Sequence, residues 1–180
     1  MEDPGGQIHR EHPFQTPLEQ RDPVLRLRGR LARGVTIWTS EGPDGPVGLT
    51  VSSVLVAEGT PSLVIGLIND TTGAFDAIGE SHGFVVHVLN DSMRSLAERF
   101  AGVRPAPGGP FKGLHVENSE FGPALGDVTD RVYCRLFDSM DAGYQRLVRG
   151  AIERVELSDL RTPLIHFRGR YRSLDPPAED

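Results

Sequence analysis

The sequence contains one cysteine, one tryptophan and no long hydrophobic run. A single cysteine, Cys134, excludes an internal disulfide framework and any metal site built from several thiolates. Its place in an alternating apolar run predicts a buried thiol with no catalytic role. The longest apolar stretch, residues 62–68, has the length of a strand and is too short to cross a bilayer as a helix.

Residues 1–21 carry no apolar segment of the kind found in signal peptides. We therefore expect a cytoplasmic protein with no membrane partner. Positive charge is also scarce, since 19 Lys and Arg residues stand against 25 Asp and Glu residues and the formal net charge is -6. This balance argues against a nucleic-acid partner, because phosphate backbones attract surfaces dense in Lys and Arg.

Catalytic and metal-binding signatures are missing as well. The six histidines are scattered along the chain, so no clustered set of metal ligands is predicted. The sequence has no glycine-rich loop of the Rossmann or Walker kind and no Gly-x-Ser-x-Gly nucleophile motif. What remains is a set of polar residues at strand ends and helix starts.

Glycine and proline are abundant, with 21 and 14 residues, which favours many turns and a fold made mainly of strands. No alternation of strand, helix and parallel strand occurs, so we expect a closed or nearly closed antiparallel barrel. Its domain covers residues 22–174, between a flexible arm over 1–21 and a disordered tail over 175–180. Apolar alternation predicts strands over 35–39, 47–55, 63–67, 84–89, 128–140, 146–157 and 164–171.

Two or three short helices complete the predicted fold. Asp22 and Pro23 form a helix start whose helix ends by Gly34. A second helix is expected over 71–81, and a third is capped by Asp91 or Ser92 and ends at Phe100. The arginines of the first segment are interpreted as a solvated face: Arg26, Arg28, Arg30 and Arg33.

Three hydroxyls, those of Thr50, Ser52 and Ser53, occur within one predicted strand. They either bond to neighbouring backbone or line a polar ligand. Residues 69–73 follow a buried strand and open a helix, where amides and hydroxyls either cap the helix or bind an anion. Arg99 ends the next helix and makes either a surface ion pair or a bidentate contact with a phosphate.

The order of six motifs resembles that of the flavin-reductase-like family, which includes the reductase components of two-component monooxygenases. The similarity spans residues 27–174. The motifs are Gly-Val-Thr-Ile-Trp-Thr at 34–39, Val-Gly-Leu-Thr-Val-Ser-Ser at 47–53, Pro-Ser-Leu-Val-Ile at 61–65, Phe-Val-Val-His-Val-Leu at 84–89, Leu-Ala-Glu-Arg-Phe at 96–100 and Phe-Arg-Gly-Arg-Tyr at 167–171.

The resemblance implies an FMN-binding split β-barrel of Greek-key topology that works as a homodimer, with the flavin near the subunit interface. FAD is the alternative flavin. NAD(P)H is implied as the reductant, and an oxygenase as the partner that receives reduced flavin. On matching positions, the isoalloxazine edge would face Thr50, Val51, Ser52 and Ser53. The ribityl-phosphate end would meet Asn69, Thr71 and Thr72, with Arg99 supplying positive charge.

The chain departs from the family where the nicotinamide is expected. A Gly-Asp-His stretch of the family reads Gly143-Tyr144-Gln145 here, so Tyr144 and Gln145 are the candidates at the site of reduction. His87 stands where the family often has Asn. The main hypothesis is an NAD(P)H-dependent flavin reductase. Two alternatives stay open, namely an FMN-dependent enzyme of the same fold with another substrate, and a non-catalytic flavin-binding module.

Overall fold

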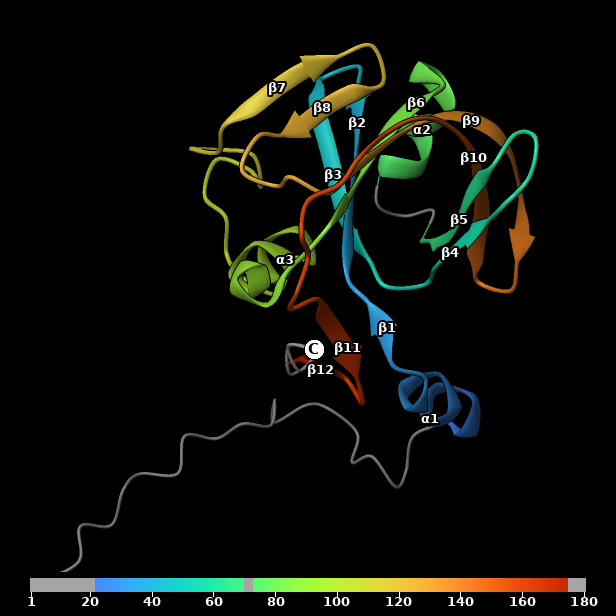
Figure 1. The fold of residues 1–180 in the computed structure, drawn as a ribbon, viewed down its shortest axis with the longest axis vertical. Helices are drawn as coiled ribbons and strands as arrows, with labels where there is room; N and C mark the ends of the chain where they lie inside the picture. Colours follow the sequence, from blue (N-terminus) through green and yellow to red (C-terminus); the bar gives the residue numbers. More distant parts are fainter. Residues whose placement is uncertain (1–21, 70–72, 175–180) are drawn as a thin grey trace, which may run out of the picture.

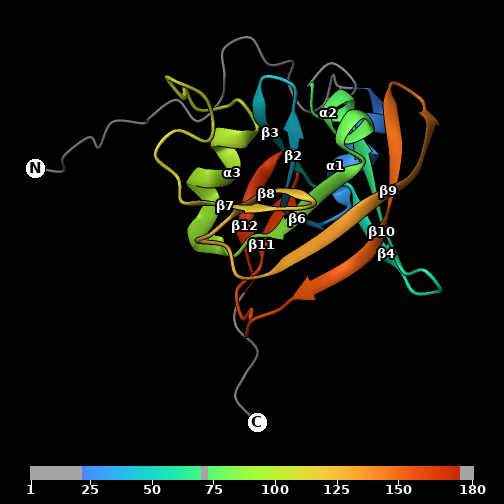
Figure 2. The ribbon, with the colours of Figure 1, turned by 90° about the horizontal axis from the view of Figure 1, so that it is seen from above.

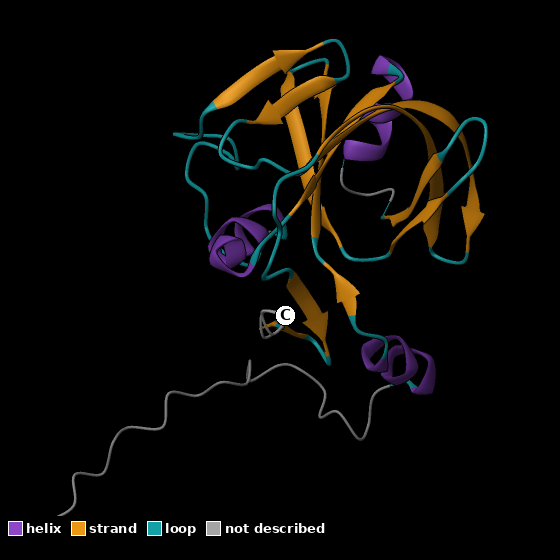
Figure 3. Ribbon diagram, viewed as in Figure 1, coloured by secondary structure: helices purple, strands orange, loops and turns teal. Residues whose placement is uncertain are grey.

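A computed structural model describes residues 22–69 and 73–174. The predicted arm over 1–21 and the predicted tail over 175–180 lie outside these residues, and so do Thr71 and Thr72. The described chain contains far more strand than helix, with short helices at its periphery (Figure 3). The expectation of a mainly β fold is confirmed.

The main sheet has seven strands, and every neighbouring pair is antiparallel. Their order is β3-β2-β6-β9-β10-β5-β4, so β3 and β4 form opposite edges although they follow one another in the chain. The strands are β2 (Thr36–Gly42), β3 (Gly45–Val51), β4 (Val54–Ala57), β5 (Leu63–Ile68), β6 (Gly83–Val88), β9 (Arg131–Ala142) and β10 (Gln145–Glu156).

Only Ser52 and Ser53 connect the two edge strands. Seven strands laid flat would span about 30 Å, whereas a link of this length reaches about 10 Å. The sheet must therefore curl until its edges approach, and Figure 1 shows β3 and β4 facing each other across the opening, with β9 and β10 arching over the top. This is the predicted antiparallel split barrel.

Two predicted strands are each divided in the structure. The segment 47–55 forms the end of β3 and the start of β4, because the chain changes edge at Ser52 and Ser53. The segment 164–171 forms a hairpin of β11 (Leu164–Phe167) and β12 (Arg170–Ser173). Its turn residues Arg168 and Gly169 have φ values of 49° and 76°, the left-handed geometry of tight hairpin turns.

Two smaller sheets were not predicted. The strand β1 (Arg33–Gly34) pairs with β11, which also pairs with β12, so the end of the chain returns to its beginning. Strands β7 (Val116–Ser119) and β8 (Gly122–Leu125) form a separate hairpin. Figure 2, seen from above, shows this hairpin beside β6 and the small sheet below it.

The first helix, α1 (Pro23–Arg30), begins as predicted, because the Asp22 carboxylate accepts hydrogen bonds from the amides of Val24 and Leu25 at 2.7 and 3.4 Å. It ends at Arg30, earlier than the predicted Gly34, because the chain enters β1 at Arg33.

The other helices are α2 (Ala74–Ser81) and α3 (Arg94–Phe100), and a 3-10 turn, η3 (Asp91–Met93), precedes α3. The predicted cap at Asp91 or Ser92 is wrong by one or two residues, because the Asn90 side chain accepts the Ser92 amide at 3.1 Å. None of the described helices combines the length and the apolar character needed to span a membrane.

Trp38 and Phe84 lie at the centre of the core, and their rings stack 4.8 Å apart at an angle of 13°. Trp38 reaches across the barrel to β5, where a Cβ atom on Gly66 would lie 2.6 Å from two of its ring carbons. Cys134 belongs to the same cluster, and burial raises the pKa of its thiol to about 12. The prediction of a buried, unreactive thiol therefore agrees with its position.

Candidate functional site

The predicted hydroxyl segment lies at the crossing between β3 and β4, where the edges of the curled sheet meet. The Thr50 hydroxyl donates a hydrogen bond to the Ala97 carbonyl at 2.7 Å, which joins β3 to α3. Val51 is buried, so only its backbone can face a ligand. Ser52 and Ser53 are half-buried and lie outside any strand. At the crossing, the half-buried Ser52 and Ser53 therefore lie next to Val51, which is fixed by its packing in the core.

The strand register brings two further predicted residues to the same end of the barrel. The Leu67 amide donates to the Ser53 carbonyl at 3.1 Å, and exposed Asn69 follows two residues later. The pair Arg146 and Ile68 across β10 and β5 places Gln145 next to that end. Candidates that are distant in sequence thus lie at one end of the barrel.

Tyr144 lies in the turn between β9 and β10 and is fully exposed, at 101% of its reference area. Gly143 has a φ of 63° in this turn, and half-buried Gln145 begins β10 opposite Ala142. Tyr144 makes no ring contact within the described part of the chain. A protruding tip of this kind meets a ligand only where the ligand, or another subunit, comes to it.

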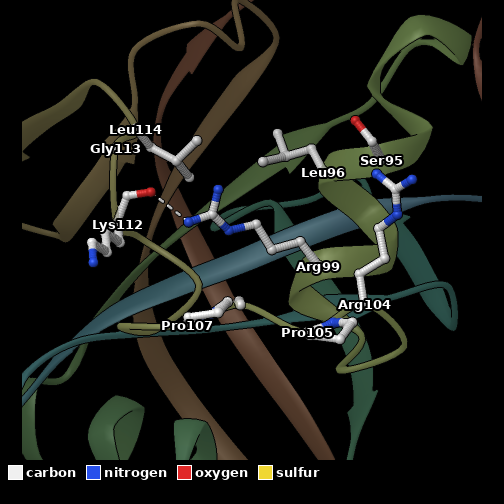
Figure 4. A pocket seen from close by; sticks show the side chains of 10 residues that line it. Ser95, Leu96, Arg99, Arg104, Pro105, Pro107, Lys112, Gly113 and Leu114 are labelled. Carbon is white, nitrogen blue, oxygen red and sulfur yellow. Dashed lines mark hydrogen bonds between the residues drawn. The ribbon is translucent and has the colours of Figure 1, made fainter.

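Arg99 lies apart from the hydroxyl segment. The hydroxyl segment meets α3 through the Thr50 hydroxyl and the Ala97 carbonyl, and no hydrogen bond joins it to Arg99 in the described part of the chain. The Arg99 guanidinium reaches instead into the loop after α3, where one of its nitrogens donates to the carbonyls of Gly109 and Lys112 at 3.2 and 2.5 Å. Figure 4 shows the side chain crossing a pocket of about 600 Å³ toward Lys112. The structure gives Arg99 the role of a loop anchor.

Arg33 is the cation that touches the hydroxyl segment. Its Nη1 atom donates to the Ser53 hydroxyl at 2.9 Å. The prediction that Arg33 belongs to a solvated face is therefore wrong, because β1 carries it inward while the arginines of α1 stay exposed. Its cross-strand partner is His166. The sequence signal was the position of Arg33 two residues before Val35, where the buried apolar segment begins.

His87, at the position where the family often has Asn, is a structural residue. It is fully buried, and its Nε2 accepts the Leu125 amide at 2.9 Å, so Nδ1 carries the proton and donates to the Ile37 carbonyl at 3.0 Å. Burial lowers the pKa of His87 to about 4. Within the described residues, no three His, Cys, Asp or Glu side chains are placed to share a metal ion.

A protein-family model described as a flavin reductase like domain matches residues 28–175. The chain belongs to the flavin reductase like family. The matched range covers the barrel, the small sheet and the last three residues of α1, so the family resemblance predicted from the motifs is confirmed.

Curated relatives agree with this assignment. The reductase component of a 4-nitrophenol 4-monooxygenase/4-nitrocatechol 2-monooxygenase from Rhodococcus opacus is 30% identical over 161 residues, which are 89% of this chain and 84% of that protein. A flavin reductase (NADH) from Kitasatospora aureofaciens is 33% identical over 171 residues, covering 88% and 87% of the two chains. The predicted class, a flavin reductase, matches the names of these relatives.

Solved structures of family members share the fold. Nitrilotriacetate monooxygenase component B from Mycobacterium thermoresistibile has a TM-score of 0.76 at 26% identity, over 86% of this chain and 87% of that chain. BorF, the flavin reductase component of a bacterial two-component tryptophan halogenase, has a TM-score of 0.73 at 25% identity, over 84% and 97% of the two chains. This chain thus shares its split-barrel fold with BorF, which is named a flavin reductase component.

Proposed function

We propose that this protein uses NADH or NADPH to reduce FMN, and that the reduced flavin passes to a partner oxygenase. The observation that carries the proposal is the β3–β4 crossing, where Ser52 and Ser53 interrupt the strand pairing beside a cation, Arg33. The names of the relatives support the reaction and the kind of partner, since they include NADH-dependent flavin reductases and monooxygenase reductase components.

The residues of the crossing fit a flavin ring. An isoalloxazine needs an apolar support and hydrogen-bonding groups along one edge, and here buried Val51 lies beside two half-buried serines. The Thr50 hydroxyl is held by the Ala97 carbonyl, so its oxygen keeps a defined position from which to accept a bond. We assign Thr50, Val51, Ser52 and Ser53 to the ring edge.

Asn69, Thr71 and Thr72 belong to the same proposal as contacts of the ribityl chain. Asn69 lies at the end of the barrel that also holds Ser53, whereas Thr71 and Thr72 lie outside the described residues. When bound, the flavin supplies a ring that accepts a hydride from the nicotinamide and passes electrons onward. The residues of this chain would hold that ring in a fixed position from which water is partly excluded.

A homodimer completes this proposal, because two apolar surfaces of the single chain are uncovered. Leu55 and Val56 are neighbours on the edge strand β4, and both are about two-thirds exposed, at 69% and 66%. Since successive strand residues point to opposite faces, the described residues leave one apolar side chain uncovered on each face of β4. The helix α1 has no buried residue, and its exposed apolar residues are Val24, Leu25 and Leu27, followed by Leu31 at its C-cap.

An isolated helix of eight residues gains too little from its own hydrogen bonds to be stable in water. A second copy that covers α1 and the β4 edge would stabilise both. It would also add residues near Ser53, since β4 begins directly after that serine.

The turn between β9 and β10 supports a second candidate function. The protruding Tyr144 and the neighbouring Gln145 carry neither a carboxylate nor an imidazole. An FMN-dependent enzyme of this fold that accepts another substrate, or a flavin-binding module without catalysis, would account for such a loop.

The deciding experiment starts from the purified protein. We expect its absorbance to show a flavin, or fluorescence titration to show binding of about one FMN per chain. Stopped-flow mixing with NADH or NADPH should then bleach the flavin absorbance, with FAD and riboflavin as comparison substrates. The absence of binding to any flavin would refute the proposal. Flavin binding without reduction by either NADH or NADPH would favour the alternatives, namely an FMN-dependent enzyme with another substrate or a flavin-binding module without catalysis.

A further inference from the structure

The most basic part of the molecule is formed by residues 22–34 and 164–173, which we call the basic sector. These two segments contain seven arginines and a single acidic residue, Asp22, although the whole chain has a net charge of -6. They lie together because β1 pairs with β11, and because the Arg168 amide donates to the Gly29 carbonyl at 2.8 Å. The Asp22 carboxylate caps α1.

Three side chains form a row across the small sheet of this sector. Arg33 on β1 lies opposite His166 on β11, and His166 lies opposite Tyr171 on β12. Directly opposed residues of antiparallel strands share one face, so the three side chains are neighbours. The His166 and Tyr171 rings meet edge to face at 5.8 Å. At its other end the row reaches Ser53, whose hydroxyl accepts the bond from Arg33.

Two nitrogen atoms in this row are buried without a hydrogen-bond partner among the described residues, namely Arg33 Nε and His166 Nδ1. Such orphaned polar atoms are rare in proteins, because each costs the free energy of its lost hydration. The Ser53 hydroxyl accepts from Arg33, so its own proton remains to be donated. Three polar groups therefore converge with bonding capacity left over.

The electrostatics of the row point to a negative ligand. Burial lowers the pKa of Arg33, and the charge of Arg28 lowers it further. Burial also lowers the pKa of His166, and Arg33 and Arg28 add to the effect. At the far end Tyr171 lies near Glu98 and Arg94 of α3, with its own pKa raised by burial first and by Glu98 second. Among the described residues, the charged groups that act on Arg33 and His166 are therefore cations.

We propose that Arg33, His166 and the Ser53 hydroxyl bind the phosphate group of a nucleotide. A phosphate dianion accepts several charge-assisted hydrogen bonds at once and suits a guanidinium, an imidazolium and a hydroxyl that face one point. The assignment of this phosphate to a nucleotide rests on the proposed function, because Ser53 also borders the proposed flavin-ring site. The evidence for an anion site is independent of that function and comes from the row of Arg33, His166 and Ser53 alone.

Direct binding is measured with inorganic phosphate on the flavin-free protein. In protein with isotope-labelled histidine, the His166 ring signal is identified by its loss in His166→Gln. We expect this signal to shift saturably with phosphate, and the pKa of His166 to rise, because a bound anion favours the charged imidazole. Sodium chloride at equal ionic strength should give no saturable shift.

Two matched variants separate a site from a general charge effect. Arg33→Gln should weaken phosphate binding about tenfold or more, as expected for loss of a charge-assisted contact. Arg170→Gln removes the same charge from an exposed position of β12 in the same sector and should change it less than about twofold. Ser53→Ala provides a second site variant if Arg33→Gln does not fold. Phosphate binding that is non-saturable, or equally strong in Arg33→Gln, would overturn the anion site.

The molecule that supplies the phosphate is identified by comparing ligands with and without a phosphate group. If it is the flavin phosphate, Arg33→Gln should weaken FMN at least about fivefold while riboflavin is unaffected. If it belongs to the dinucleotide, the two flavins should be affected alike, and ADP-ribose should displace inorganic phosphate from the wild type. If neither result is found, the proposal that the phosphate belongs to a nucleotide is wrong. A protein that binds phosphate at this site yet oxidises neither NADH nor NADPH would refute the proposed reductase activity and leave the anion site standing.

Discussion

His87 Nε2 accepts a hydrogen bond from the Leu125 amide at 2.9 Å, which ties the β7–β8 hairpin to the middle of the main sheet. The bond requires a neutral imidazole, because a protonated Nε2 has no lone pair to offer. His87 is thus a hydrogen-bond acceptor built into the core, and it makes the fold sensitive to acid.

We expect stability to fall as the pH drops from about 6.5 toward about 4, because the unfolded chain binds a proton at His87 near its ordinary pKa while the native state, with a pKa of about 4, does not. The loss over this window is on the order of 3 kcal/mol. Urea unfolding at a series of pH values measures it. His87→Gln should reduce the slope in this window, and an unchanged slope would show that other groups cause the acid sensitivity.

Gly66→Ala should destabilise the fold by about 1–3 kcal/mol, because the added methyl group meets the Trp38 ring and Trp38 is stacked on Phe84. The matched control is Gly79→Ala in α2, where a Cβ atom meets nothing within 4 Å and the free energy of unfolding should rise by about 0.5–1 kcal/mol. Denaturant midpoints compare the two. Equal stabilities would mean that the barrel interior relaxes around the methyl group.

Leu55→Lys should convert the proposed dimer to a monomer, because it places a charge on the uncovered edge strand. Light scattering across a micromolar concentration series reports the mass. Val103→Lys changes an equally exposed residue, at 72%, in the loop after α3 and should leave the mass unchanged. A wild-type protein that is monomeric and still binds flavin would contradict the dimer.

Arg99→Ala tests the predicted phosphate contact against the role as loop anchor. Its guanidinium is already bonded to Gly109 and Lys112, so we expect FMN and riboflavin affinities to change alike. Hydrogen exchange in the loop after α3 should become faster, and stability should fall by about 1–2 kcal/mol. A loss specific to FMN would instead support the sequence prediction for Arg99.

The last prediction concerns the β9–β10 tip. Tyr144→Asp combined with Gln145→His should raise turnover with NADH while FMN affinity stays the same, because positioning of the nicotinamide governs hydride transfer. The gain should be up to about a hundredfold, and exposure of Tyr144 makes the change structurally tolerable. Steady-state NADH oxidation measures it. Rapid turnover by the wild type would show that this tip is dispensable.

The alternation of apolar residues predicted most main-sheet strands, because a strand that buries one face must repeat every second residue. It failed where the break in that pattern is short. Residues 47–51 alternate, Ser52 and Ser53 interrupt the alternation by a single position, and the closure of the barrel decides that the chain changes edge there. The Arg168 and Gly169 turn was missed for a related reason, since arginine rarely adopts the positive φ seen there.

The sequence alone determined the barrel class and the family, because these depend on local periodicity and on the order of motifs, and it singled out the hydroxyls of residues 50–53 as candidates. The tertiary structure decided which cation accompanies them. Arg99 and Arg33 are equivalent in a sequence, as single charges near apolar segments. The loop after α3 binds the guanidinium of Arg99, while pairing of β1 with β11 brings Arg33 to His166, 133 residues later in the sequence, and to Ser53. Long-range strand pairing of this kind leaves no local signature in the sequence.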